Sequence, residues 1–168
     1  MLYEIFAAAR GPLAATRAGD AEGRSAMMAR TIDSIAVRGE GLFLLLGRLA
    51  IGALFVPAGY QHLTNLKGFA QYLGGHGLPG PAMAWAIVGA FIEFFGGLAV
   101  LVGFKTRYAA LAVIAFTIAA TLIGHPFWAA PEGQIEAQTI SFFKNLAIIG
   151  GLLFVFVRGG GPISIDRR

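Results

Sequence analysis

Four apolar runs, each about as long as a lipid bilayer's hydrocarbon core is thick, constrain this chain more than any other feature. They cover residues 41–60, 82–103, 107–124 and 139–157. A helix needs about 20 residues to cross a core of about 30 Å. Within lipid, a helix satisfies every backbone polar group of such a run internally. The runs therefore predict an all-α fold, an integral membrane four-helix bundle with antiparallel neighbours.

The composition agrees with lipid as the surrounding solvent. Hydrophobic residues make up 57% of the chain and charged residues only 13%, about half the share usual in soluble domains. The sequence contains no cysteine, which excludes disulfides, thiolate metal sites and thiol redox chemistry by this chain itself. The net charge is +4, but no basic stripe is interleaved with aromatic residues, so nucleic-acid binding is not expected.

The segments that join the runs differ in kind. Residues 61–81 place apolar side chains on one helical face, which predicts a short helix in the membrane interface, ended by the GGHGLPGP stop. Residues 104–106 form a tight turn between antiparallel neighbours. Residues 125–138 form a loop in which Phe127 and Trp128 are placed for an interfacial aromatic belt. The apolar face of the predicted interfacial helix consists of Leu63, Leu66, Phe69, Ala70 and Leu73.

The distribution of positive charge predicts the orientation. An even number of spans leaves both termini on one side, and that side carries nearly all of the Arg and Lys outside the spans. By the positive-inside rule, both termini are cytoplasmic. The charges on this side are Arg10, Arg17, Arg24, Arg30, Arg38, Lys105, Arg107, Arg158, Arg167 and Arg168, against Lys67 and Lys144 on the other.

The chain divides into an arm, a membrane domain and a tail. Residues 1–40 are too polar to span a bilayer and lack the apolar core of a signal peptide, so we expect a cytoplasmic arm that is partly interfacial or disordered. Met27 or Met28 offers an alternative start, and whether residues 1–27 belong to the natural protein stays open. Residues 41–158 form the membrane domain, and residues 159–168 form a short cytoplasmic tail.

Two charged residues inside the runs are candidate catalytic residues. A charge at the centre of a bilayer costs about 2.5–3.5 kcal/mol, so it marks either a structural pair or a site. Arg48 and Glu93 lie at similar estimated depths, about 10 and 15 Å from the cytoplasmic ends of their helices, and we expect them to pair. The pair either fixes the packing of two helices, or it makes Glu93 a proton acceptor or a ligand for a polar substrate group.

A second polar group gathers where three runs meet the exterior. Its members are candidate binding residues, although a solvated rim would explain them as well, and Lys144 can extend its amine to the headgroups. If they face inward, they and the Arg48–Glu93 pair line one polar path from the middle of the membrane to the exterior. The three histidines lie on different segments without ligand spacing, so no metal site is expected. The candidate binding residues are Tyr60, His62, His125, Lys144 and Asn145.

Small residues flank the acidic position in the second run. Gly89, Gly96 and Gly97 share or border the helical face of Glu93. They allow close approach of either a neighbouring helix or the ring of a flat ligand.

Three sequence blocks resemble the DoxX family of small bacterial and archaeal membrane proteins. They are RLAIGALFVPAGYQHL at 48–63, EFFGGLAVLVGFKTRYAA at 93–110 and FFKNLAIIGGLL at 142–153, and the likeness covers residues 42–158. The resemblance implies a four-helix membrane bundle in the plasma membrane of a bacterium or archaeon. It also implies a link to oxidoreductases, because one member is a small subunit of a thiosulfate:quinone oxidoreductase. By position, the family's recurring polar residues correspond to Arg48, Glu93, Lys144 and Asn145.

We therefore expect an accessory or quinone-facing subunit of a membrane oxidoreductase, with quinone as ligand, no covalently bound cofactor, and the redox centre in a partner protein. Two alternatives stay open: a carrier for a small hydrophobic or weakly acidic solute, and a purely structural assembly subunit. Whether the chain is catalytic and whether it forms a homo-oligomer also stay open.

Overall fold

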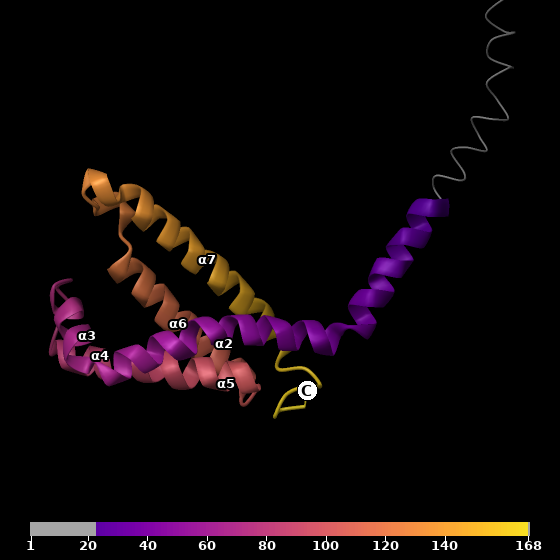
Figure 1. Ribbon diagram of the computed structural model, residues 1–168, viewed down its shortest axis with the longest axis horizontal. Helices are drawn as coiled ribbons and strands as arrows, with labels where there is room; N and C mark the ends of the chain where they lie inside the picture. The colour runs from indigo at the N-terminus through magenta and orange to yellow at the C-terminus, as the bar shows by residue number, and fades with distance from the viewer. Residues whose placement is uncertain (1–22, 168) are drawn as a thin grey trace, which may run out of the picture. The chain divides into compact units, whose positions relative to one another are not determined.

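The computed structural model describes residues 23–167, and within this range the regular structure is entirely helical (Figure 1). The chain divides into two compact units, Met1–Glu40 and Gly41–Arg168. In the first unit, residues 23–38 form a helix, and the rest of the predicted arm, residues 1–22, lies outside the described residues. The second unit holds the other helices, of which α2 begins at the last residue of the first unit. They are α2 (Glu40–Thr64), α3 (Leu66–Gly74), α4 (Ala82–Phe91), η1 (Ile92–Gly96), α5 (Gly97–Val102), α6 (Thr106–Gly124), η2 (Phe127–Ala129), η3 (Glu132–Gln134) and α7 (Ile135–Arg158).

The predicted four-helix membrane architecture is confirmed. In the described part of the chain, four helical stretches are long and apolar enough to cross a membrane: Glu40–Thr64, Ala82–Val102, Thr106–Ala129 and Glu132–Arg158. Their mean hydropathy lies between 1.8 and 2.1. Many large apolar side chains face outward, among them Phe154 with 75% of its surface exposed. Such a surface requires lipid around it.

The second span is one continuous stretch with a change of helix type in its middle. Here α4 passes into η1, a five-residue π-helical segment, which continues directly as α5. A π turn holds an extra residue compared with an α turn, which shifts the side chains that follow it, and such turns are frequent at functional sites. Glu93 lies in this π segment. The hydrophobic run predicted the span but not this turn.

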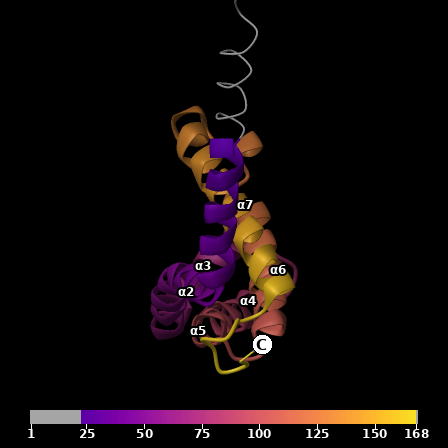
Figure 2. The same cartoon turned by 90° about the vertical axis from the view of Figure 1, so that its right-hand side faces the viewer.

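The helices pack closely because glycines lie at their crossings. Seen end-on in Figure 2, α4 and α5 lie between α2 and α6, and α7 lies beside α6. A Cβ on Gly59 of α2 would come within 2.4 Å of the Phe94 backbone nitrogen, and one on Gly97 would come within 2.6 Å of Phe55 Cβ. Gly96 faces Val113 of α6. These glycines therefore serve helix packing.

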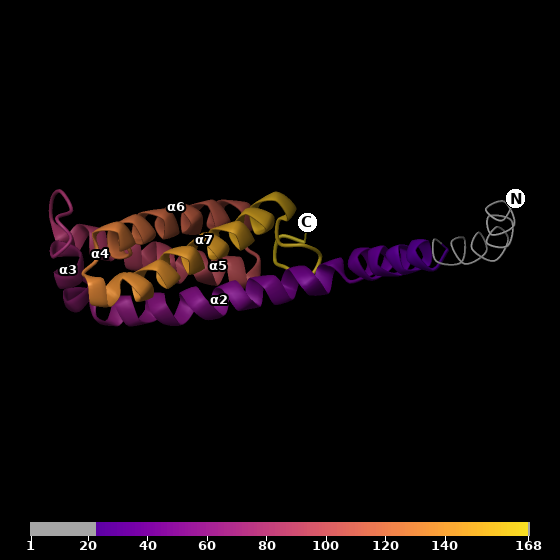
Figure 3. The same cartoon turned by 90° about the horizontal axis from the view of Figure 1, so that it is seen from above.

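The predicted helix in the long link is present as α3, with Asn65 as its N-cap. Its apolar face lies on protein: Ala70 and Leu73 are buried in a cluster with Ala86 of α4. Lys67 and Gln71 face outward. The amphipathic pattern that predicted a helix in the interface is thus satisfied largely by contact with α4. Figure 3 shows α3 crossing one end of the bundle, with the C-terminal tail at the other.

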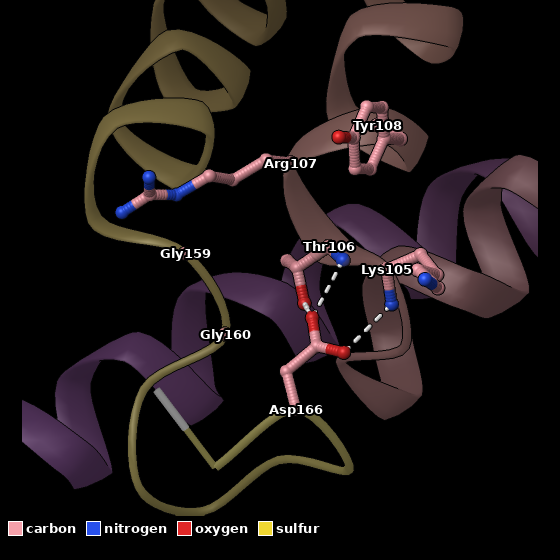
Figure 4. Close-up of a pocket in the computed structure, with 7 residues that line it drawn as sticks. All are labelled: Lys105, Thr106, Arg107, Tyr108, Gly159, Gly160 and Asp166. Atoms are coloured by element: carbon pink, nitrogen blue, oxygen red, sulfur yellow. Dashed lines mark hydrogen bonds between the residues drawn. The ribbon is translucent and has the colours of Figure 1, made fainter.

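The C-terminal tail folds back onto the turn between α5 and α6 (Figure 4). The backbone amides of Ile165 and Asp166 donate to the carbonyls of Val102 and Gly103, at 3.2 and 2.9 Å. The carboxylate of Asp166 accepts from the backbone amides of Lys105 and Thr106, at 2.9 and 2.7 Å, and from the Thr106 hydroxyl at 2.7 Å. Asp166 therefore caps α6, whose own N-cap Lys105 supplies no side-chain bond.

These contacts change the titration of the tail carboxyl. The hydrogen bond from the Thr106 amide is the largest cause that holds the pKa of Asp166 below its ordinary value. The charged form is stabilised because the amides at a helix N-terminus have no partner within the helix.

The predicted pair between Arg48 and Glu93 is wrong. Arg48 is 1% exposed, and its guanidinium donates to the carbonyl of Leu101 at 3.0 Å and to the carbonyl of Ile163 in the tail. Leu101 lies eight residues beyond Glu93, about 12 Å further along the helix. Depths counted from the ends of hydrophobic runs missed this offset. The partner that Arg48 finds is the partly negative C-terminal end of α5.

Candidate functional site

A cavity of about 760 Å³ lies in the half of the bundle away from the tail. Side chains from α2, α3, α4, η1, α6 and α7 surround it. Its walls are mainly apolar and aromatic, including Phe69, Trp85 and Phe116. A Cβ on Gly89 would lie 3.4 Å from the rings of both Phe69 and Phe116. The glycine therefore has no side chain to cover these aromatic rings.

The charged centre of the cavity is a pair between Glu93 and His62. Glu93 Oε2 lies 2.6 Å from His62 Nδ1, and the two side chains are 9% and 35% exposed. The imidazole stacks on Phe69, with ring centroids 3.9 Å apart and an angle of 8° between the planes. The π segment presents Glu93 to the last turns of α2, where His62 lies. A carboxylate in this position fixes both the tautomer and the orientation of the imidazole.

Two further polar side chains of the cavity are oriented by neighbours. His125 Nδ1 lies 2.8 Å from Gln138 Oε1. Asn145 Nδ2 donates to Thr121 Oγ1 at 3.0 Å, and Thr121 in turn donates to the carbonyl of Thr117 at 2.5 Å. These bonds join the end of α6 to the N-terminal half of α7.

Lys144 brings a positive charge to the same cavity. It lies nine residues after the first residue of α7, about 14 Å along the helix. Within residues 23–167, no ion pair or hydrogen bond holds its ammonium group. The cation therefore remains available to a ligand in the cavity.

The structure brings five of the seven predicted site residues together. His62, Glu93, His125, Lys144 and Asn145 all line the cavity. The predicted path from Glu93 toward the end of the bundle thus has a counterpart in the structure, although its Arg48 portion does not.

Tyr60 and Arg48 are the two predicted residues outside this group. Tyr60 is 61% exposed, and its ring lies beside Phe94, with centroids 6.4 Å apart. Arg48 lies toward the tail, as described above. Tyr60 and His62 are two residues apart, about 200° around the helix, so they face opposite sides. The sequence alone did not show which of the two faces the cavity.

The orienting residues were missed by sequence reasoning. Thr117 and Thr121 are four residues apart on an otherwise apolar helix, and both are buried. That spacing is the signal that places two hydroxyls on one helical face. Gln138 gave no such signal, because it was assigned to a loop and lies in the first turns of α7.

Among residues 23–167, no three His, Asp or Glu side chains lie close enough together to hold a metal ion. The polar groups suit proton exchange instead. An imidazole backed by a carboxylate can take up a proton and be stabilised as the imidazolium. Lys144 can stabilise a negative charge that develops on a bound molecule.

Comparisons with known proteins connect this membrane domain to a family. The family model described as DoxX matches residues 43–126. The inner membrane protein YphA of Escherichia coli is 32% identical over 127 residues, which cover 76% of this chain and 90% of that protein. The inner membrane protein YqjF of the same organism is 38% identical over 128 residues, covering 76% and 92%.

A more distant likeness extends to a eukaryotic protein. A Surfeit locus protein 4 homolog of Schizosaccharomyces pombe is 31% identical over 71 residues, 41% of this chain and 24% of that protein. No solved structure matches the chain.

Proposed function

Because this chain belongs to the DoxX family of multi-pass membrane proteins, we propose that its cavity binds a membrane quinone as part of an oxidoreductase complex. The observation that carries the proposal is an apolar, aromatic cavity that reaches the buried Glu93 and its partner His62. The two relatives from Escherichia coli are inner membrane proteins, which supports the bacterial inner membrane as the location.

The dimensions and chemistry of the cavity fit a quinone ring. A volume of about 760 Å³ lies in the range of sites for small organic ligands, about 300–1,000 Å³. Gly89 has no side chain to fill the wall next to Phe69 and Phe116, which leaves these aromatic side chains accessible to a flat ring. Polar groups from separate helices, including His62 and Lys144, surround this space and can hydrogen-bond to ring oxygens.

The residues of this chain handle protons in the proposal. A quinone, when bound, supplies the two-electron chemistry. His62 holds or releases a proton at Nε2, and Glu93 stabilises the charge that this proton creates on the ring. The phenylalanine and tryptophan side chains keep water away from the ligand. The chain has no cysteine, so the proposal assigns electron transfer to a partner redox protein.

Intrinsic fluorescence tests quinone binding directly. The chain has two tryptophans: Trp85 lines the cavity, whereas Trp128 does not. We expect a short-chain benzoquinone to quench the full-length protein in nanodiscs with a saturable component. This component should disappear in Trp85→Phe and persist in Trp128→Phe. Quenching that shows no saturable component would contradict the proposal.

A variant of Glu93 that lacks the charge tests whether the Glu93–His62 pair contributes to quinone binding. Glu93→Gln keeps the shape of the side chain but removes its charge, and we expect the dissociation constant to rise about tenfold, or 1.4 kcal/mol. Glu136→Gln is the matched control, because Glu136 is an exposed acid in the first turn of α7. An equal rise of the dissociation constant in both variants would show that Glu93 has no specific role in quinone binding.

Lys144 favours a second candidate function, a carrier for a small weakly acidic solute. An ammonium group that lines an apolar cavity without a partner in the described chain attracts an anion. Proteoliposomes that contain the purified chain would then take up a lipophilic weak acid when a pH gradient is imposed. Uptake equal to that of empty liposomes would exclude this candidate.

A further inference from the structure

The hydrogen-bond partner of Asn145 decides which end of its amide is left for a ligand. Thr121 has a single hydroxyl proton, and it donates this proton to the carbonyl of Thr117 at 2.5 Å. Toward Asn145, Thr121 can therefore only accept. The amide nitrogen takes that bond at 3.0 Å. The amide oxygen Oδ1, an acceptor, remains unused by this network.

The hydrogen-bond partner of His125 likewise determines which of its ring nitrogens is left for a ligand. Its Nδ1 lies 2.8 Å from the amide oxygen of Gln138. That oxygen can only accept, so Nδ1 carries the ring proton. In the neutral imidazole, Nε2 then has a free lone pair. His125 lines the cavity, and the ring nitrogen left for a ligand is an acceptor.

His62 offers a third acceptor. The Glu93 carboxylate faces its Nδ1 at 2.6 Å, so in the neutral ring the proton lies on Nδ1 and the lone pair on Nε2. The ring is stacked on Phe69, which holds its plane. His62 of α2, His125 directly after α6 and Asn145 of α7 all present unused acceptors.

Two donors of the cavity wall are already engaged. The indole N–H of Trp85 donates to the carbonyl of Pro79 at 2.7 Å. The hydroxyl of Thr117 donates to the carbonyl of Val113 at 2.7 Å. The donors left in the lining are the ammonium of Lys144, the hydroxyl of Tyr72 and the second N–H of the Asn145 amide. No donor of the described chain bonds to the free acceptors of His62, His125 and Asn145, so these acceptors are paired only if a ligand supplies hydrogen-bond donors.

We propose that this cavity recognises a flat aromatic molecule by its hydroxyl protons, and so binds a hydroquinone more tightly than the corresponding quinone. A quinone oxygen only accepts hydrogen bonds and would leave the acceptors of His62, His125 and Asn145 unpaired. A phenolic hydroxyl donates to one of them, and its oxygen can still accept from Lys144. The inference rests on the proposed quinone-binding function and adds the oxidation state that the site prefers.

Direct binding of three related ligands tests the inference. Tritiated decylbenzoquinone, its hydroquinone and the dimethyl ether of that hydroquinone are each titrated, without oxygen, onto the full-length protein in nanodiscs. Empty nanodiscs correct for partition into lipid. We expect the hydroquinone to bind at least tenfold more tightly than the quinone. The ether, which lacks the protons but keeps the ring, should bind no better than the quinone.

The outcomes separate the two proposals. A quinone that binds as tightly as the hydroquinone, or an ether that matches the hydroquinone, overturns this inference and leaves the quinone-binding function intact. If none of the three ligands binds saturably, the proposed function fails and the inference fails with it.

A substitution outside the cavity lining tests whether the hydrogen bond from Asn145 to Thr121 sets the preference for hydroquinone. Thr121→Val keeps the shape of the side chain but frees the Asn145 amide to present its nitrogen to the ligand. We expect the preference for hydroquinone over quinone to fall about threefold or more. Thr139→Val on α7 is the control, since the Thr139 hydroxyl bonds only to the carbonyl of Ile135, and it should keep the preference. An unchanged preference in Thr121→Val, measured on folded protein, would show that this orientation does not select the ligand.

Discussion

The guanidinium of Arg48 donates to the main-chain oxygen of Ile163, a residue 115 positions later in the chain. The same group donates to the carbonyl of Leu101 at 3.0 Å. One side chain of α2 thereby joins the end of α5 to the C-terminal tail. The charge is buried, and the two carbonyls that it contacts belong to a helix end and a loop, where no helical amide satisfies them.

Replacing Arg48 should therefore loosen the tail before it disrupts the bundle. Arg48→Met keeps most of the apolar stem but leaves two partly buried carbonyls without their charged donor. We expect the free energy of unfolding to fall by about 2–4 kcal/mol, since a hydrogen bond to a charged group contributes about 1.5–3 kcal/mol. Hydrogen exchange at residues 163–166 should rise.

Lys67→Met is the control for this variant, because Lys67 is an exposed cation on α3. It should leave both measurements unchanged. Tail exchange in Arg48→Met that equals the wild-type rate would mean that the tail is held by its other contacts alone.

Asp166 gives the tail a dependence on pH. Its pKa is lowered from the ordinary value of 3.8, first because of the hydrogen bond from the Thr106 amide. A carboxyl with a lower pKa in the folded protein stabilises the fold above its unfolded pKa. That contribution disappears as the pH falls through the lowered value. The tail contact should be fully formed at neutral pH and weaken below about pH 4.

The matching variant is Asp166→Asn, which should lower the protection of the Thr106 amide about fivefold at pH 6, consistent with a lost helix cap of about 1 kcal/mol. The difference from wild type should shrink as the pH falls below 4. Glu132→Gln, an exposed acid in η3, should show no such difference. A gap between Asp166→Asn and wild type that stays constant down to pH 2 would exclude titration of Asp166 as the cause.

The sequence predicted the elements well and the polar partners poorly, for a physical reason. Hydrophobic length determines a span, and length can be read directly from residues such as those at 41–60. The hydrogen-bond partners of a buried side chain depend on how far neighbouring helices are shifted along their axes. They also depend on where the C-terminal tail folds back. Arg48 was therefore matched with Glu93, although its partner Leu101 lies eight residues, about two helical turns, beyond Glu93.

The candidate site was partly predictable because its polar residues lie near the ends of three apolar runs. His62, His125 and Lys144 could be grouped from topology alone. The π segment around Glu93 has no sequence signature of this kind, and neither does the hydrogen bond that turns the Asn145 amide. These details arise from the close approach of helices, which is a tertiary property.

Gly59 is the position where that close approach is tightest. A Cβ there would meet the backbone of Phe94 at 2.4 Å, and a backbone cannot rotate away as a side chain can. Gly59→Ala should push α2 away from η1 and lower the free energy of unfolding by about 1–3 kcal/mol. Because the contact is next to Glu93, quinone binding should weaken as well.

Gly47 of the same helix provides a matched control, since nothing lies within 4 Å of a Cβ built there. Gly47→Ala should be neutral or stabilise the protein by up to about 1 kcal/mol, because alanine favours helix. Equal stability of the two variants in detergent-based unfolding would mean that α2 and η1 are not in close contact at Gly59.

The predicted orientation, with the tail in the cytoplasm, can be tested because the chain has no native cysteine. Two single-cysteine variants suffice. Arg167→Cys lies in the exposed tail, and Gly133→Cys lies in the segment between α6 and α7, where nothing lies within 4 Å of an added Cβ. In intact cells, a membrane-impermeant maleimide should label position 133 and spare position 167. In permeabilised cells, both positions should be labelled. The parent protein, which has no cysteine, should not be labelled in either preparation. Labelling of position 167 but not position 133 in intact cells would show that the orientation is the reverse of the predicted one. The cavity around Glu93 would then lie toward the cytoplasm.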